Sequence, residues 1–339
     1  MSSLTPVTGT PAEVLTLLRA WQAAEDPGPV VVATSGSTGE PKDVVLSRAA
    51  MRASASATER RLGGIGQWLL NLPASYVAGL QVLFRSVLAG TTPVVQDADL
   101  ASAAATMTGE RRYVSLVPTQ LTRLLDDERQ AEALRRFDTV LVGGARLDPA
   151  LRSRAAQAGV AVVSTYGMSE TCGGCVYDGR PLDGVEVAVG DDGRVRLGGP
   201  VLFDRYDGQP DLTAQVKRDG WFTTQDLGRL DDGVLTVLGR ADDVVLSGGV
   251  NVPAPAVADR LRAHPAVRAA EVVGVQDDEW GQRVVAVLVG DLGLEEARDW
   301  VTAVHPRAWA PRDVVALDAL PLLDNGKVDR LAVQRAAAR

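Results

Sequence analysis

The sequence has 339 residues, 46% of them hydrophobic, and a formal net charge of −8. This length and composition are typical of a globular protein with two domains, because one domain usually holds about 100 to 200 residues. The acidic balance argues against a nucleic-acid partner, which needs a basic face, and the lack of any apolar run near the roughly 20 residues of a membrane span argues against a membrane protein.

The first 180 residues predict strands that alternate with helices. Short apolar runs predict buried strands at Val30–Ala33, Gln67–Leu70, Thr92–Val95, Tyr113–Val117, Thr139–Val142 and Val160–Ser164. Helices are predicted between several of them, at Ser47–Arg61, Val77–Ala89, Thr119–Leu125 and Pro149–Ala158. This order favours right-handed crossovers and a largely parallel sheet, so the expected fold class is α/β.

After residue 180 the pattern changes to short strands separated by Asp-Gly turns. Strands are predicted at Val185–Val189, Arg194–Leu197, Trp221–Thr224 and Val234–Leu238. The stretches DDGRV, RDGWF and DDGVL are strong turn signals, so this region is expected to form a small barrel or meander.

A second boundary falls at GRADDVVLSGG (239–249), after which strand, helix and strand patterns resume. We therefore expect an N-terminal domain of residues 1–239 and a C-terminal α+β domain of residues 240–339. The first nine residues lack the charged and then apolar order of a signal peptide, so the expected location is the cytoplasm.

The loop TSGSTGEPK (34–42) offers backbone N–H groups, hydroxyls and one ammonium. Such groups hold a polyphosphate, because glycine lets the backbone approach while amides and hydroxyls donate to phosphate oxygens. The loop lacks the spacing of a Walker motif, which argues against a P-loop kinase, and by itself it is also compatible with a plain surface turn. Only three of the 35 basic residues are lysines, Lys42, Lys217 and Lys327, and two of them fall in motif-like stretches.

The only cysteines, Cys172 and Cys175, are spaced C-G-G-C. This spacing is compatible with a redox couple or with half of a zinc site. A zinc site is disfavoured because a second pair is missing and His264 and His305 lie far away in the sequence.

Five motifs in order resemble those of the adenylate-forming enzymes, the family of acyl- and aryl-CoA ligases, luciferases and peptide-synthetase adenylation domains. TSGSTGEPK resembles the phosphate-binding loop of that family. The others resemble its adenine and magnesium motif, its ribose motif, its hinge with glycine loop, and its C-terminal lysine motif: STYGMSET (164–171), WFTTQDLG (221–228), GRADDVVLSGGVNV (239–252) and DNGKVDR (324–330). The resemblance covers nearly the whole chain and implies a large N-terminal α/β domain with a β-rich part and a small C-terminal domain.

The resemblance implies an ATP site. Lys42 and the loop before it would hold the β- and γ-phosphates, Tyr166 would stack on adenine, and Glu170 would bind the Mg²⁺ that bridges the phosphates. Asp226 would bind the ribose hydroxyls, with a further contact from Arg240. The expected ATP-binding residues are Thr34, Ser35, Gly36, Ser37, Thr38, Gly39, Gly143, Gly144, Ala145, Tyr166, Gly167, Met168, Ser169, Thr171, Asp226 and Arg240.

The resemblance gives the C-terminal domain two roles. Lys327 would stabilise the attacking carboxylate and the α-phosphate, so the expected catalytic residues are Lys327, Lys42 and Glu170. Asp242 stands at the hinge, and Ser247, Gly248 and Gly249 would line the route of the coenzyme A thiol after the domain turns.

Within the family, three stretches resemble the o-succinylbenzoate-CoA ligases of menaquinone biosynthesis: LPASYVAGLQVLFRSVLAG (72–90), SLVPTQLTRLL (115–125) and YGMSETCGGCVYDGRPLDGV (166–185). This implies o-succinylbenzoate, ATP and coenzyme A as substrates and Mg²⁺ as the metal. The acid is expected to bind at Ser75, Tyr76, Gly79, Gly173 and Gly174. On this interpretation the cysteines are small apolar residues in a wall beside the acyl site, and the redox interpretation is displaced.

Other interpretations stay open. Taken singly, Asp226 is compatible with a turn or cap, Glu170 with a charge at a helix N-terminus, Arg240 with a surface ion pair and Lys327 with a solvated lysine. The family motifs also fit another aryl- or medium-chain acyl-CoA ligase, or a stand-alone adenylation domain that loads a carrier protein, and a homodimer is possible. A non-enzymatic relative would be expected to lack Lys327 or Glu170, and both are present.

The chain also departs from the family pattern. Only 33 residues precede Thr34, Ser75 and Tyr76 stand where a histidine is common, Gln225 replaces a glycine, and Ala256 or its neighbour replaces a glutamate. None of these changes removes a group that the chemistry needs.

Overall fold

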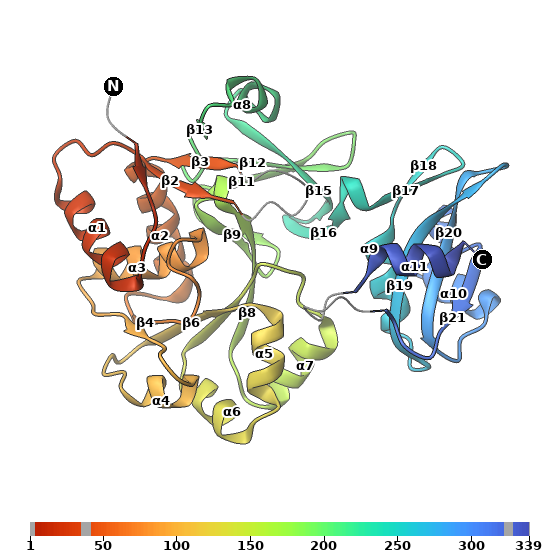
Figure 1. Ribbon diagram of the computed structural model, residues 1–339, viewed down its shortest axis with the longest axis horizontal. Helices are drawn as coiled ribbons and strands as arrows, with labels where there is room; N and C mark the ends of the chain where they lie inside the picture. The colour runs from red at the N-terminus through yellow and green to blue at the C-terminus, as the bar shows by residue number, and fades with distance from the viewer. Residues whose placement is uncertain (1–3, 35–41, 322–327, 339) are drawn as a thin grey trace. The chain divides into compact units, whose positions relative to one another are not determined.

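The computed structural model describes residues 4–34, 42–321 and 328–338 (Figure 1). The chain divides into two compact units. The first takes in Met1–Ala188, Arg196–Thr223 and Leu230–Leu235, and the second Val189–Val195, Thr224–Arg229 and Thr236–Arg339. The domain boundary between residues 239 and 240 stays a prediction. No helix in the described ranges is long and apolar enough to cross a membrane.

A seven-stranded sheet forms the centre of the first unit. Its order is β10-β9-β8-β7-β6-β4-β5, with bounds β4 Gln67–Leu70, β5 Val94–Val95, β6 Arg112–Leu116, β7 Thr139–Val142, β8 Val162–Met168, β9 Gly173–Tyr177 and β10 Arg180–Pro181. Strands β4 to β8 pair in parallel, whereas β9 and β10 join antiparallel at one edge. The predicted parallel α/β sheet is confirmed.

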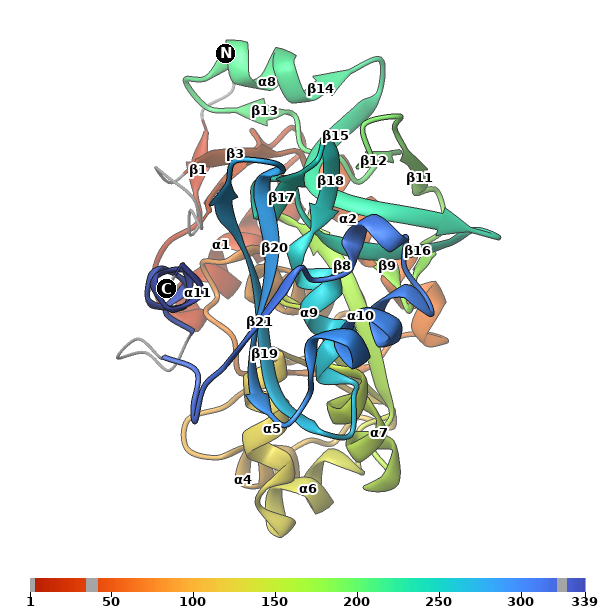
Figure 2. The same ribbon diagram turned by 90° about the vertical axis from the view of Figure 1, so that its right-hand side faces the viewer.

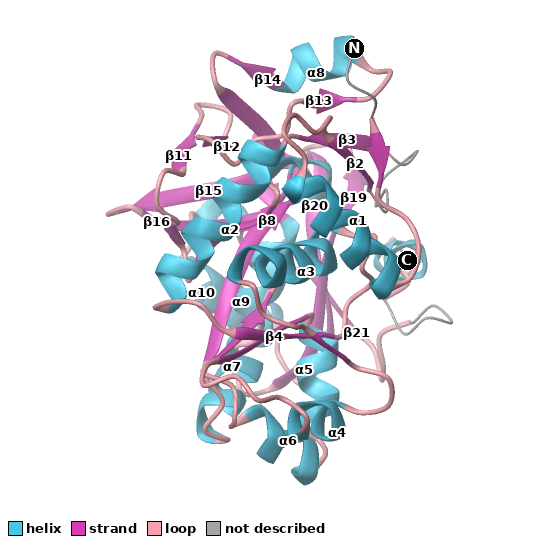
Figure 3. Cartoon of the chain, turned by 90° about the vertical axis from the view of Figure 1, so that its left-hand side faces the viewer, coloured by secondary structure: helices cyan, strands magenta, loops and turns pink. Residues whose placement is uncertain are grey.

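Helices cover both faces of this sheet. They are α1 Pro11–Ala23, α2 Arg48–Leu62, α3 Val77–Ala89, α4 Leu100–Ala105, α5 Pro118–Leu125, α6 Glu128–Leu134 and α7 Pro149–Gln157. Helices α2 and α3 pack against β9, α3 also packs against β4, and α1 lies on α3, as Figure 3 shows from their side. Helices α4 to α7 cover the opposite face.

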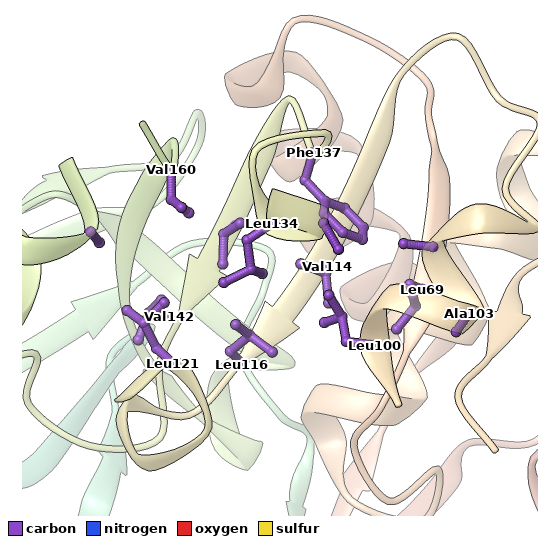
Figure 4. Close-up of a cluster of buried hydrophobic side chains, with 14 of the residues drawn as sticks. Leu69, Leu100, Ala103, Val114, Leu116, Leu121, Leu134, Phe137, Val142 and Val160 are labelled. Atoms are coloured by element: carbon purple, nitrogen blue, oxygen red, sulfur yellow. The ribbon is translucent and has the colours of Figure 1, made fainter. Parts of the chain in front are cut away.

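Burial of both faces of the sheet explains why its strands are continuous apolar runs in the sequence. Leu69, Val114 and Leu116 lie on this face and pack against Leu100, Leu134 and their neighbours (Figure 4). The side chains in between point to the other face, where the rings of Trp68 and Tyr113 lie 5.1 Å apart. Because side chains alternate along a strand and both faces are buried, both sets are apolar.

A four-stranded sheet begins the chain. Its order is β1-β2-β3-β13, with bounds β1 Thr5–Pro6, β2 Val30–Ala33, β3 Asp43–Leu46 and β13 Arg205–Tyr206. Strand β3 pairs antiparallel with β2 on one side and with β13 on the other. The sequence analysis did not predict β3, whose partner β13 lies some 160 residues later in the chain.

The β-rich region forms a five-stranded sheet of order β11-β12-β15-β14, with β16 beside β15. The bounds are β11 Glu186–Val189, β12 Arg194–Gly198, β14 Lys217–Arg218, β15 Trp221–Asp231 and β16 Val234–Arg240, and helix α8 spans Pro210–Val216. Two predicted Asp-Gly turns are confirmed: Asp219–Gly220 and Asp232–Gly233 both have positive φ at both residues, as tight hairpins require.

The sheet of the second unit holds β17 Val244–Ser247, β18 Val250–Pro253, β19 Val267–Asp277, β20 Gly281–Gly290 and β21 Asp313–Ala316. Helices α9 Ala254–Arg262 and α10 Leu294–Thr302 lie on one face, against Val284, Ala286 and Leu288. Helix α11 Arg330–Ala337 lies on the other face (Figure 2). There Val333 packs against Val285 and Val287. Short 3-10 turns occupy Ser169–Thr171, Ala241–Asp243 and Arg307–Trp309.

Several predicted strand ends were wrong. The strand predicted at Val160–Ser164 starts at Val162 and continues to Met168, because Thr165–Met168 pair with β9. The strand predicted at Trp221–Thr224 continues to Asp231, and the one at Thr92–Val95 begins only at Val94. In each case the pairing partner, which lies elsewhere in the chain, decides where the strand ends.

Candidate functional site

The carboxyl ends of β4, β6, β7 and β8 lie along one edge of the central sheet, because these strands are parallel. Residues of three sequence motifs follow or end these strands: Ser75–Gly79 after β4, Gly143–Ala145 after β7, and Tyr166–Thr171 at the end of β8. Ligands of open α/β sheets bind outside this edge. The fold thus collects motifs that are far apart in the sequence.

Strands β2 and β3 enclose the phosphate-loop motif. The backbone N–H of Thr34 donates to the carbonyl of Lys42 at 2.9 Å, and the N–H of Lys42 donates to Oγ1 of Thr34 at 3.0 Å. These bonds close the base of the hairpin at both ends of the motif. The expected residues Ser35, Gly36, Ser37, Thr38 and Gly39 lie outside the described residues.

A buried tyrosine joins two of the expected catalytic residues. The hydroxyl of Tyr206 donates to Oε1 of Glu170 at 2.7 Å, and Nζ of Lys42 lies 5.3 Å from the centre of the Tyr206 ring. Tyr206 is 3% exposed and Glu170 8%. The sequence analysis missed Tyr206, because its strand β13 has only two residues and carries no periodic signal of its own.

The segment before Tyr206 is firmly held. The N–H of Phe203 donates to the carbonyl of Glu170 at 2.8 Å, and the Phe203 and Tyr206 rings lie 4.9 Å apart. Lys217 donates to the carbonyls of Phe203 and Asp204, and burial lowers its pKa. Burial, and then the charge of Glu170, raise the pKa of Tyr206, so its phenol stays a neutral donor.

Two expected glycines lie close to neighbouring groups, Gly143 to a side-chain hydroxyl and Gly167 to a backbone carbonyl. A Cβ on Gly143 would lie 2.3 Å from Oγ1 of Thr165, and a Cβ on Gly167 would lie 2.1 Å from the carbonyl oxygen of Gly173. Neither position therefore accepts a side chain. Tyr166 is half-buried at the end of β8, and Gly144 and Ala145 are exposed in the loop after β7.

The turn that carries Glu170 is fixed by its own hydroxyls and by two helices. Oγ1 of Thr171 accepts from the N–H of Met168 at 2.9 Å and donates to the carbonyl of Gly173 at 2.7 Å. The carbonyl of Cys172 then accepts from Ser54 of α2 and Gln81 of α3, at 3.0 and 2.9 Å.

Both cysteines are buried in the wall beneath this turn. Burial raises the pKa of Cys172 and raises that of Cys175 to about 12, so both stay protonated thiols. The described residues contain no group of three or more His, Cys, Asp and Glu that could hold a metal by itself.

The expected acid-binding residues lie where α3 begins. Tyr76 is the N-cap of α3 and is 46% exposed, and Ser75 is half-buried beside it. Gly79 is buried, and a Cβ there would lie 2.2 Å from the carbonyl oxygen of Pro73. Gly79 is thus explained by packing within the turn. Gly173 faces Gln81, and Gly174 faces Thr165.

A buried arginine, Arg85, follows one turn after Gln81 on α3. Its NH2 group donates to Oγ1 of Thr58 at 3.2 Å, and that oxygen lies 3.1 Å from the hydroxyl of Tyr177 on β9. Its guanidinium stacks on the ring of Trp68 at 5.0 Å, and its buried Nε has no hydrogen-bond partner among the described residues. Burial lowers its pKa, yet a guanidinium remains charged at neutral pH, and no described carboxylate pairs with it.

The remaining expected residues belong to the second unit. The N–H of Asp226 donates to Oγ1 of Thr224 at 3.0 Å. Arg240 ends β16, and Asp242 lies in the 3-10 turn Ala241–Asp243. Ser247 is buried, and Gly248 and Gly249, with φ of 57° and 77°, form the turn between β17 and β18. Lys327 lies outside the described residues.

Comparisons with known proteins extend these observations. Residues 19–206 match the model of a family described as AMP-binding enzyme, and residues 256–327 match that of the AMP-binding enzyme C-terminal domain. The chain is 45% identical, over 339 residues, to the probable 2-succinylbenzoate-CoA ligase of Mycobacterium tuberculosis, covering 95% of this chain and 88% of that protein.

Solved structures are similar as well. A structure of o-succinylbenzoate CoA synthetase (MenE) from Bacillus subtilis with the acyl-adenylate intermediate OSB-AMP matches with a TM-score of 0.72 and 29% identity, over 90% of this chain and 68% of that one. The same enzyme with ATP and magnesium ion matches with a TM-score of 0.72 and 29% identity, over 89% of this chain and 69% of that one.

Proposed function

Because this chain belongs to the family of AMP-binding enzymes, with both family models matched in order, we propose that it is an AMP-forming ligase of o-succinylbenzoate and coenzyme A. The observation that carries this assignment is the 45% identity, over 95% of the chain, to a relative named as a 2-succinylbenzoate-CoA ligase. The placement of Lys42 and Glu170 on either side of Tyr206 supports the nucleotide chemistry.

The reaction has two steps. In the first, one carboxylate oxygen of the acid attacks the α-phosphorus of ATP, and the bond from that phosphorus to the oxygen bridging to the β-phosphate breaks. Pyrophosphate departs, and an acyl-adenylate remains. The sulfur of coenzyme A then attacks the acyl carbon, AMP leaves, and the thiol proton is released to solvent. Positioning and charge stabilisation account for such catalysis, and it needs no Ser-His-Asp set.

We assign the phosphates to the hairpin loop and Lys42, and the adenine to the edge formed by Gly143–Ala145 and Tyr166–Ser169. Gly143 lies against the hydroxyl of Thr165 and Gly167 against the carbonyl of Gly173, so both segments pack closely at the carboxyl edge of the sheet. Asp226 and Arg240 remain the proposed ribose contacts, and Thr171 holds the turn that carries Glu170.

The residues present fit a magnesium ion that arrives with ATP. Mg²⁺ in such sites usually takes one or two protein carboxylates and completes its shell with waters and phosphate oxygens. Glu170 supplies one buried carboxylate, and one of its oxygens is bonded to Tyr206. The ion would neutralise phosphate charge, and Glu170 would hold it.

Arg85 is proposed to bind the second carboxylate of o-succinylbenzoate. A buried cation without a carboxylate partner is costly, and an anionic ligand removes that cost. Strand β9 runs from Gly173, beside Gln81, to Tyr177, beside Arg85, so an acid placed at Gly173 and Gly174 would extend along β9 toward the guanidinium.

The C-terminal residues are proposed to serve the two steps separately. Lys327 would act in the first step, and the turn of Ser247, Gly248 and Gly249 would border the path of coenzyme A in the second, with Asp242 at the hinge. The cytoplasmic location, the lack of membrane and nucleic-acid partners, and a homodimer stay predictions.

The test is pyrophosphate release from ATP with o-succinylbenzoate, benzoate and a medium-chain fatty acid, each with and without coenzyme A. Selective release with o-succinylbenzoate and formation of its thioester are expected. Release with another acid would keep the mechanism and overturn the substrate. Release without a thioester would favour an adenylation domain that loads a carrier protein.

A further inference from the structure

Tyr206, which lies outside the expected motifs, is placed between Lys42 and Glu170. Its hydroxyl contacts the carboxylate and its ring face contacts the ammonium. Lys42 directly precedes β3, Tyr206 lies in β13 and Glu170 in the turn after β8, so only the tertiary fold brings them together.

Strand register explains how Tyr206 reaches Lys42. Tyr206 pairs with Val44 across the β13–β3 ladder. Lys42 precedes Val44 by two residues and therefore points to the same face, as a diagonal neighbour of Tyr206. An ammonium at this distance over a tyrosine ring is attracted to the ring face.

The hydroxyl of Tyr206 forms a hydrogen bond with one oxygen of the Glu170 carboxylate. Oε1 accepts a hydrogen bond from the phenol at 2.7 Å, whereas no hydrogen bond from the described residues reaches Oε2. A side chain that bonds to a metal-binding carboxylate fixes its orientation, and loss of such a partner typically weakens metal binding by about 10- to 100-fold.

We propose that Tyr206 is a positioning residue of the nucleotide site: its hydroxyl orients Glu170 toward the metal that accompanies ATP, and its ring orients Lys42 toward the phosphates. This inference rests on the proposed function for the identity of the ligands. It adds to the site a residue that lies outside the five motifs identified in the sequence.

The first test is the variant Tyr206→Phe, which keeps the ring and removes the hydroxyl. Mn²⁺, used as a paramagnetic probe, is titrated into the protein with a non-hydrolysable ATP analogue, and free Mn²⁺ is measured by electron paramagnetic resonance. We expect about tenfold weaker metal binding, with analogue binding in the presence of EDTA changed less than about twofold. Tighter metal binding would mean that the phenol competes with the metal, and unchanged binding would mean that it has no role; either result overturns the proposal.

The matched control is Tyr113→Phe, which removes another buried phenol whose hydroxyl contacts the carbonyls of Leu62 and Gly64. A loss in both variants would indicate a general effect of a missing buried hydrogen bond. The double variant Tyr206→Phe/Glu170→Gln removes the buried charge and so supplies a second background if Tyr206→Phe does not fold. The double variant should bind Mn²⁺ as weakly as Glu170→Gln alone, because the Tyr206 hydroxyl acts through the carboxylate that both variants lack.

The readouts separate the two proposals. Failure of the wild-type chain to release pyrophosphate with any acid would overturn the proposed function, while metal and nucleotide binding would still test Tyr206. A wild-type chain that is active, with Tyr206→Phe equal to it in metal binding and in the Mg²⁺ dependence of pyrophosphate release, would overturn the role of Tyr206 alone.

Discussion

A Cβ on Gly167 would lie 2.1 Å from the carbonyl oxygen of Gly173, on the neighbouring strand β9. The obstacle is backbone in a paired strand and cannot swing aside as a side chain can. We therefore expect Gly167→Ala to lower the free energy of unfolding by about 1–3 kcal/mol and to weaken ATP binding. Urea unfolding and nucleotide titration measure both effects.

The control for this substitution is Gly293→Ala. No heavy atom lies within 4 Å of a Cβ there, and φ is −74°, so only the N-cap preference of glycine is lost. Its cost should stay below about 1 kcal/mol. Equal losses in the two variants would contradict a steric role for Gly167.

Arg85→Met is expected to separate substrate binding from stability. Without the guanidinium, the KM for o-succinylbenzoate should rise by about tenfold to hundredfold, since a charged hydrogen bond is worth about 1.5–3 kcal/mol. The KM for benzoate, which lacks the second carboxylate, should not change. The free energy of unfolding should stay the same or rise, because a buried cation without a carboxylate is removed.

The matched control is Arg60→Met, which removes an arginine whose ion pair with Asp183 lies at the surface. It should leave KM values unchanged for both acids. If Arg85→Met raises KM for benzoate and o-succinylbenzoate alike, Arg85 supports the pocket rather than the second carboxylate.

The two cysteines are expected to be unreactive in the folded protein. The thiolate is the reactive form, and burial raises the pKa of Cys175 to about 12 and that of Cys172 further. A thiol-specific reagent at pH 8 should label neither residue in the native state and both in urea. Fast native labelling, or activity that depends on a reductant, would restore a redox role.

Asp178 provides a pH-dependent test of how α7 is tied to β8. Oδ1 accepts from Arg152 at 2.7 Å and from the N–H of Ser164 at 3.0 Å. Burial acts to raise the pKa of Asp178, but these hydrogen bonds outweigh it and hold the pKa below its usual value. The stabilisation is therefore fully present above the unfolded pKa of about 3.9 and is lost as pH falls through the folded pKa.

Asp178→Asn should then cost about 0.5–1 kcal/mol at pH 7, a modest value because the pair is partly exposed. Asparagine tolerates the positive φ of 48° at this position, so the comparison isolates the charge. Urea unfolding at pH 7 and pH 3 should show the difference shrinking at the lower pH. A difference that grows as pH falls would contradict the sign.

Lys327→Ala and Gly249→Ala should affect opposite steps. With Lys327→Ala, pyrophosphate release should fall by about 100-fold or more, because a charge that stabilises the transition state is lost. Conversion of a synthetic acyl-adenylate to the thioester should change little. Gly249→Ala should slow mainly that second step, because alanine is strained at a φ of 77°. Rapid-quench measurements of each step decide this, and parallel losses in both variants would refute the division of roles.

The sequence by itself determined the elements that carry strong local signals. Helix Val77–Ala89 and strands Val30–Ala33, Gln67–Leu70 and Thr139–Val142 have the predicted bounds, because apolar runs and glycine stops act locally. Asp-Gly dipeptides likewise determined the tight turns at Asp219 and Asp232. The ordered motifs were sufficient to predict the family, since the residues of each motif are continuous in the chain.

Only the tertiary structure decided contacts between distant segments. Strand β8 continues to Met168 because β9 pairs with it, and β3 exists because β2 and a two-residue strand from position 205 flank it. The same long-range pairing places Tyr206 against Glu170, and packing of α2 and α3 on β9 buries Arg85 beside Thr58 and Tyr177. Such contacts depend on which segments meet in space, and one-dimensional periodicity carries no record of that.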